Sequence, residues 1–93
     1  MSNANTKTEL HEFTADGQLV TGPGVVVGLI CTTNPSSLDL HDGTSASDPK
    51  IASTIFTVAG DWCIFPDGHM PEFVTGLYAN VTGTTPACKV YTA

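Results

Sequence analysis

The chain has 93 residues, of which 41% are hydrophobic and 13% are charged, and its formal net charge is −6. A chain of this length forms one small domain with a thin core, which leaves little room for the deep cleft of an enzyme. The chain contains three lysines and no arginine. It therefore cannot neutralise a row of phosphates, and we expect no nucleic-acid binding.

The low share of charged residues bears on the surface of the domain. Soluble domains carry about 25% charged residues, so 13% indicates a surface partly covered by something other than water. An assembly subunit has this profile. No stretch approaches 18 apolar residues, and the first residues lack the basic and apolar regions of a signal peptide. We expect neither a membrane-spanning nor an exported protein.

Apolar residues recur at every second position or in short runs, which predicts an all-β fold. Residues 1–8 are polar and small, and we expect them to form an extended arm rather than part of the core. Strands are then predicted over residues 9–15 and 18–21, because Asp16-Gly17 between them is a typical hairpin turn.

The middle of the chain holds the strongest strand signal. Residues 25–33 form a β-branched, nearly continuous apolar run, which is typical of a central strand. Residues 37–41 alternate, which places two leucines inward and Asp39 and His41 outward.

The second half of the chain completes the pattern. The segment 66–71 contains two prolines and is predicted to be a loop. With turn signals between them, about eight short strands predict a single antiparallel β-sandwich over residues 9–93. The remaining strands are expected over residues 50–58, 62–65, 72–81 and 87–92.

Three aspartates lie near one predicted hairpin and could supply oxygen ligands to a calcium ion: Asp39, Asp42 and Asp48. Their spacing fits no EF-hand loop, and aspartate and glycine favour hairpins for backbone reasons alone. We therefore expect no metal site and no cofactor.

The histidines and cysteines show no ligand spacing and no nucleophile motif, so we expect a protein that is not an enzyme. We expect the histidines, His11, His41 and His69, to be solvated or to face a partner. Cys31, Cys63 and Cys88 lie in apolar runs, which is typical of reduced thiols used as small hydrophobic residues, and one disulfide between two of them is the alternative.

Large apolar residues flank the predicted loop, and two interpretations compete. In one, Trp62, Phe65 and Phe73 point into the sandwich and the loop only reverses the chain. In the other, the tip at residues 69–71 packs on a neighbouring subunit, because exposed apolar patches mark interfaces.

Three segments carry a resemblance to a known class of proteins: residues 24–31 (GVVVGLIC), 38–47 (LDLHDGTSAS) and 73–83 (FVTGLYANVTG). They resemble small structural proteins of tailed bacteriophages, in which a glycine-flanked aliphatic strand precedes an Asp-Gly-Thr hairpin and a late Gly-Leu-Tyr strand. The similarity covers about residues 22–92.

The resemblance implies a capsid decoration, or cement, protein. Such a β-sandwich is made in the host cytoplasm, sits on the capsid exterior of the virion, often as a trimer, and reinforces contacts between major capsid proteins. The expected partners are the major capsid protein and copies of the chain itself. The expected contact residues are Asn3, Asn5, Thr6 and Thr8 in the arm and Pro66, His69, Met70 and Pro71 in the loop.

The alternative is a receptor- or carbohydrate-binding β-sandwich module of a phage fibre or tail. That function requires exposed aromatic side chains in a groove, and only Tyr78, Tyr91 and Trp62 are available for it. If strand alternation places Tyr78 and Trp62 in the core, this alternative loses its aromatic platform.

Overall fold

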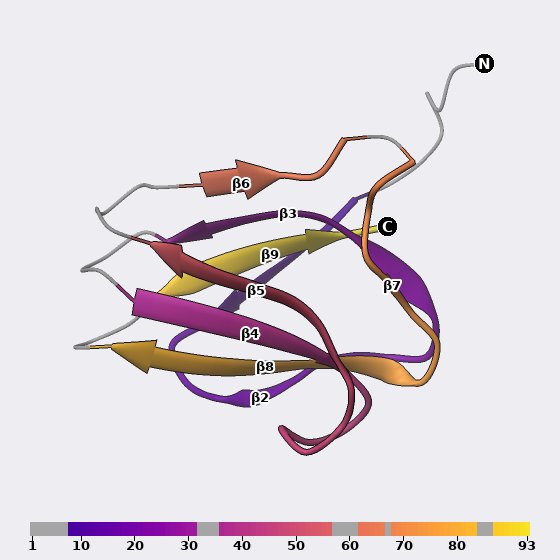
Figure 1. Cartoon of the computed structure of the whole chain (residues 1–93), viewed down its shortest axis with the longest axis horizontal. Helices are drawn as coiled ribbons and strands as arrows, with labels where there is room; N and C mark the ends of the chain where they lie inside the picture. Colours follow the sequence, from indigo (N-terminus) through magenta and orange to yellow (C-terminus); the bar gives the residue numbers. More distant parts are fainter. Residues whose placement is uncertain (1–7, 32–35, 57–61, 67, 84–86) are drawn as a thin grey trace.

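The computed structural model describes residues 8–31, 36–56, 62–66, 68–83 and 87–93, which form nine strands in two packed antiparallel sheets (Figure 1). The predicted all-β sandwich is thereby confirmed. No helix in these described ranges is long and apolar enough to cross a membrane. The five-stranded sheet contains β1 (Glu9–Phe13), β3 (Gly24–Cys31), β6 (Trp62–Ile64), β7 (Glu72–Phe73) and β9 (Cys88–Thr92). The four-stranded sheet contains β2 (Gly17–Thr21), β4 (Ser36–Asp42), β5 (Lys50–Phe56) and β8 (Gly76–Gly83).

The last strand in chain order lies inside its sheet. The strand order is β1-β9-β3-β6, with β7 also paired to β3, so β9 has a neighbour on each side. Glu9 of β1 lies opposite Thr92 of β9, which in turn lies opposite Val26 of β3. The other sheet has the order β2-β8-β4-β5, in which only β4 and β5 form a hairpin of consecutive strands. Most of the pairing is therefore between segments far apart in the sequence.

The predicted strand over residues 72–81 is two strands, because the chain changes sheets between β7 and β8. The corner is held by Asp42, whose carboxylate accepts hydrogen bonds from the backbone N–H of Thr75 at 2.9 Å and of Val74 at 3.0 Å. Gly76 follows immediately, and a Cβ there would come within 2.7 Å of the carbonyl oxygen of Val20. A larger residue does not fit at this corner.

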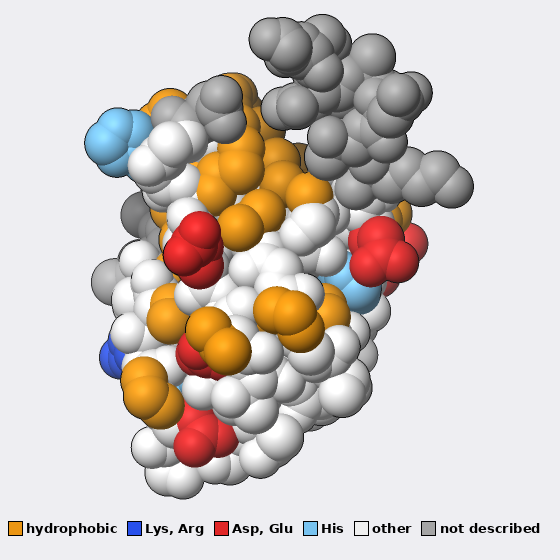
Figure 2. All heavy atoms as spheres, turned by 90° about the vertical axis from the view of Figure 1, so that its right-hand side faces the viewer, with side chains coloured by type: hydrophobic (Ala, Val, Ile, Leu, Met, Phe, Trp, Pro, Cys, Tyr) orange, Lys and Arg blue, Asp and Glu red, His pale blue; other side chains and the backbone are white. Residues whose placement is uncertain are grey.

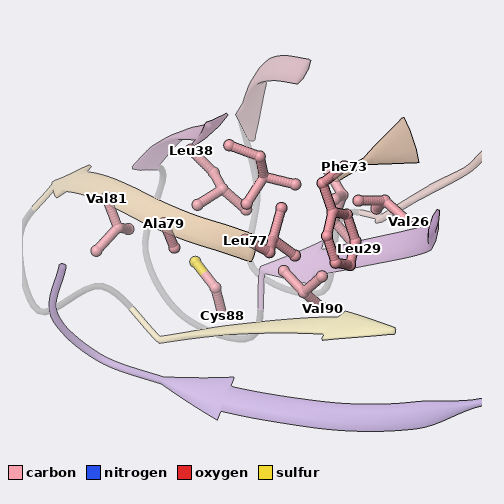
Figure 3. Close-up of a cluster of buried hydrophobic side chains, with 10 residues drawn as sticks. Val26, Leu29, Leu38, Phe73, Leu77, Ala79, Val81, Cys88 and Val90 are labelled. Carbon is pink, nitrogen blue, oxygen red and sulfur yellow. The ribbon is translucent and has the colours of Figure 1, made fainter. Parts of the chain in front are cut away.

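The core lies between the two sheets and is made by the inward residues of both (Figure 3). Leu38 and Leu40 of β4 are almost fully buried, as the alternation predicted. They face side chains of β9 and β3, among them Val90. Full burial of an aliphatic side chain contributes about 1.5–3 kcal/mol. The buried cluster comprises Val26, Leu29, Leu38, Leu40, Phe73, Leu77, Ala79, Val81, Cys88 and Val90.

One histidine departs from the prediction that it is solvated. His41 follows a register shift in β4 and is only 4% exposed. Its Nδ1 lies 2.9 Å from the carbonyl oxygen of Asp48, and its ring meets the edge of Tyr78 at a centroid distance of 6.4 Å. Asp48, in the turn between β4 and β5, therefore lies against the ring. Alternation within a strand gives no information about such a contact.

Candidate interaction surface

The outer side of the five-stranded sheet carries a row of apolar side chains. The alternation that turns Leu29 and Val90 into the core turns their neighbours Ile30 and Tyr91 outward. In register, Ile30 lies opposite Trp62 of β6, and Gly28 lies opposite both Tyr91 and Ile64. We call the following residues the apolar face: Leu10, Ile30, Trp62, Ile64 and Tyr91.

The apolar face is open and contains a shallow hollow. Trp62 is 64% exposed, Ile64 is 61% exposed and Leu10 is 46% exposed. The hollow has a volume of about 400 Å³ and is lined by Leu29, Ile30, Trp62, Ile64 and Tyr91. Gly28 lies beneath it, since a Cβ there would sit 3.5 Å from Cδ1 of Ile64. Large exposed apolar patches of this kind mark interaction surfaces.

The two outer surfaces of the sandwich differ in polarity. On the apolar face, Glu12 of β1 lies opposite Lys89 of β9, so the two charges there are of opposite sign. The four-stranded sheet instead presents polar groups, and Ser53 donates a hydrogen bond of 2.6 Å to Asp39. Lys50 lies 3.5 Å from the same carboxylate. Among the described residues, each outer surface therefore pairs an acidic side chain with a basic one.

The aspartates that might have bound calcium each have partners of their own. Asp48 accepts hydrogen bonds from the N–H groups of Thr44 and Ser45, whereas Asp42 binds the β7–β8 corner. The backbone N–H of Thr75, and then that of Val74, lower the pKa of Asp42. In the described part of the chain, no three His, Cys, Asp or Glu residues gather in a way that could hold a metal ion.

The histidines and cysteines lie in different environments. His11 bonds to the hydroxyl of Thr92 at 2.9 Å, and His69 is exposed. Cys88 is buried in the core, and Cys63 is partly buried and packs against the core cluster, as expected of small hydrophobic residues. The side chain of Cys31 lies outside the described part, although its backbone pairs with Cys88.

Thr8 and Pro71, which end the two predicted contact segments, lie at the same end of the five-stranded sheet. Thr8, which is exposed, directly precedes Glu9, and Glu9 leads through its partners in β9 to Val26 of β3. The N–H of Val26 donates to the carbonyl oxygen of Pro71 at 2.8 Å. The loop therefore ends at the same end of the sheet as the start of β1, with β9 and β3 between them, and the C-terminus lies at this end in Figure 1. Asn3, Asn5 and Thr6 lie outside the described residues.

The loop itself is only partly exposed. Pro66 and His69 are exposed and joined by a turn hydrogen bond of 2.9 Å, whereas Met70 and Pro71 are half-buried. Figure 2 views this end of the molecule and shows hydrophobic side chains gathered in its upper half, with acidic side chains below and beside them. We call the last residue of the arm together with the described loop residues the arm end: Thr8, Pro66, His69, Met70 and Pro71.

Only some of the aromatic residues around the loop point into the sandwich, as the first of the two interpretations predicted for all of them. Phe73 is buried in the core and Phe65 packs against it, as the first interpretation predicted. Trp62 points away from the core, so that interpretation is wrong for this residue. The sequence did contain a signal for the apolar face, because β3 is apolar on both sides in a fold of only two layers.

Comparison of the chain with protein families, with curated proteins and with solved structures found no match. Function is therefore inferred from the surfaces of the domain and from the resemblance in its sequence.

Proposed function

We propose that the protein is a non-enzymatic structural subunit of a phage virion, a capsid cement or decoration protein that binds the outer capsid surface and stabilises contacts between major capsid proteins. One observation supports the proposal. Thr8, the last residue of the arm, and Pro71, the last residue of the loop, lie at the same end of the sandwich. The phage assignment comes from the sequence resemblance.

The arm end is suited to binding a protein surface. The sandwich is folded before it binds, so binding orders few further groups and little affinity is lost to conformational entropy. An extended arm adds main-chain hydrogen bonds to an open strand edge of the partner. The polar outer side of the four-stranded sheet is then free to face solution, and the net charge of −6 keeps particles apart.

The described carboxylates also support a structural role. Asp42 and Asp48 bind backbone N–H groups at turns, and Asp16 accepts a hydrogen bond of 2.7 Å from the N–H of Val81. These side chains hold the fold together, so they are poorly placed to act as acids or bases on a substrate.

The test is co-sedimentation with undecorated phage heads. We expect the full chain to sediment with the heads at a fixed stoichiometry. Deleting residues 1–8 should leave the circular dichroism spectrum of the domain unchanged and reduce its occupancy on the heads. Thr82→Ala, on the outer side of the opposite sheet, is the control and should bind as the wild type does. Full occupancy by the truncated protein would overturn the role of the arm.

A second function, binding of a receptor or carbohydrate by a fibre or tail module, is favoured by the exposure of Trp62. Together with Tyr91 it lines the hollow, so an aromatic platform is present. Sugars and receptors would be tested with immobilised glycans and host cells. Glycan binding that Trp62→Ala abolishes, with no binding to heads, would favour this second function over the first.

A further inference from the structure

We infer that Cys31 and Cys88 form a redox-sensitive pair, which a small oxidising disulfide converts into a cross-link between the end of β3 and the start of β9. Three pairings are open to the three cysteines of the chain, and the register of the five-stranded sheet selects this one. The inference does not depend on the proposed function.

The register places the two cysteines directly opposite each other. Cys31 is the last residue of β3, Cys88 is the first residue of β9, and the two are Cα partners in the antiparallel ladder. Opposite residues in such a ladder have Cα atoms about 4.5 or 5.5 Å apart, depending on whether the pair exchanges backbone hydrogen bonds. A disulfide joins residues whose Cα atoms are about 4.4–6.8 Å apart. The backbone therefore holds this pair at bridging distance.

The hydrogen bonds at the other end of the ladder show which type of pair this is. Ala93 and Val25 exchange both of their backbone hydrogen bonds, each 3.0 Å long. The register shift places its extra residue in β3, so the residues of β9 pair without interruption. Hydrogen-bonded and non-hydrogen-bonded residues alternate along a strand. Counting back from Ala93, Cys88 is a non-hydrogen-bonded residue, the type in which opposite residues lie closest.

Cys63 lies beyond the reach of both other cysteines. It is the Cα partner of Leu29, so it is the diagonal neighbour of Cys31, at a distance of about 7–8 Å. Because β6 and β9 flank β3, two strand spacings, or about 9.6 Å, separate Cys63 from Cys88 even before their offset along the strands is added. Cysteines with Cα atoms more than about 7 Å apart cannot be bridged without backbone movement.

The position of the pair at strand ends gives an oxidant access to it. Cys88 is only 2% exposed and lies among the core side chains (Figure 3). A thiol buried in this way does not react while the fold is closed. Strand ends, however, open locally at a lower free-energy cost than the middle of a sheet. Both cysteines are terminal residues of their strands, so one local opening exposes them together.

The reaction is a thiol–disulfide exchange with oxidised glutathione. The thiolate of one cysteine attacks a glutathione sulfur, breaks the S–S bond and forms a mixed disulfide, and the displaced glutathione takes up a proton. The second cysteine then attacks the protein sulfur of the mixed disulfide and releases the second glutathione. The protein gives up two electrons and two protons to the oxidant, so its mass falls by about 2 Da. Excess thiol reverses the reaction.

The pairing is tested on the folded full-length protein. After incubation with oxidised glutathione, the remaining thiols are blocked with N-ethylmaleimide and the mass is measured under denaturing, non-reducing conditions. We expect a single chain with an internal disulfide and one maleimide, on Cys63, whereas the protein treated with dithiothreitol carries three maleimides. The same reaction in concentrated urea should instead favour Cys63–Cys88, because that bond closes the shortest loop.

Two variants separate the effect of the register from general thiol reactivity. Cys63→Ala keeps the pair and, once oxidised, should bind no maleimide, whereas Cys31→Ser should still bind maleimide at both of its remaining thiols. Oxidation should raise the urea midpoint of Cys63→Ala by on the order of 1 M, because a cross-link restricts the unfolded chain. The midpoint should return on reduction, and that of Cys31→Ser should not change.

Four results would overturn the inference. They are a bond from Cys63 to either other cysteine in the folded protein, glutathione adducts without an internal disulfide, disulfide-linked dimers, and a urea midpoint of Cys63→Ala that oxidation leaves unchanged. Circular dichroism of each reduced variant verifies that it is folded before oxidation. Binding to phage heads is measured separately, and its failure would leave this pairing standing.

Discussion

Two leucines of this protein show how far position decides the effect of one substitution. Leu40 is completely buried in the core, whereas Leu10 is 46% exposed on the apolar face. Leu40→Ala should lower the free energy of unfolding by about 2–5 kcal/mol, because it removes buried methyl groups and leaves a cavity. Leu10→Ala should change it by less than about 1 kcal/mol. Urea unfolding of the monomer at low micromolar concentration measures both values, and equal losses would contradict the assigned core.

For Trp62, the sequence pattern alone does not predict whether the side chain is buried or exposed. Strand alternation identified Leu38 and Leu40 as inward residues because polar residues separate them. In Trp62–Ile64 and the Phe65 that follows, every residue is apolar, so the pattern does not say which side faces the core. The orientation follows from pairing with β3, where Leu29 fixes Cys63 as the inward residue.

At the scale of the element, the turn between β7 and β8 depends on one carboxylate. Hydrogen bonds from the N–H of Thr75 and of Val74 favour the charged form of Asp42 and lower its pKa in the folded state. A lowered folded pKa means that this contribution to stability is present above about pH 4, the range of an unfolded aspartate, and is lost as the pH falls through the lower folded value.

The change Asp42→Asn tests this role of the carboxylate. The variant should unfold at a lower urea concentration than the wild type at pH 7. The difference should shrink at about pH 3, below the usual pKa of an unfolded aspartate, because the unfolded wild type then takes up a proton and the stability from the charged carboxylate is progressively lost. Glu9→Gln, which changes an exposed carboxylate of β1, is the control and should show only a small difference at both pH values. A loss in Asp42→Asn that is equally large at both pH values would contradict the electrostatic role.

Strand boundaries were predicted well because the turns between them carry their own chemistry. The observed strands begin and end close to the turn residues of the sequence, Asp16-Gly17 and the prolines at 66 and 71. The division of residues 72–81 was missed because its cause is not local. Asp42 lies 32 positions before Val74 in the sequence, and only the folded chain brings them together. The position of Thr8 and Pro71 at the same end of the sheet was hidden for the same reason.

At the scale of the whole molecule, the first and the last residues of the sequence differ in their importance for folding. Residues 1–8 precede the first strand, whereas β9 joins β1 to β3 and supplies Cys88 and Val90 to the core. Deleting residues 88–93 should therefore unfold the domain, while deleting residues 1–8 should leave it folded. Backbone amide hydrogen exchange distinguishes the two outcomes. Protection of β3 amides that survives removal of β9 would contradict the topology.

The central place of β9 also determines when the sheet can form during synthesis. Because β1 pairs with β9, the five-stranded sheet cannot close until residues 88–92 have left the ribosome. Contacts such as Glu9 with Thr92 span almost the whole chain, and such distant pairings make folding slow, on the order of milliseconds to seconds. During that interval the apolar β3 of each nascent chain stays unpaired on the side that β9 will occupy. Synthesis of many copies at once therefore creates the greatest risk of aggregation before folding is complete.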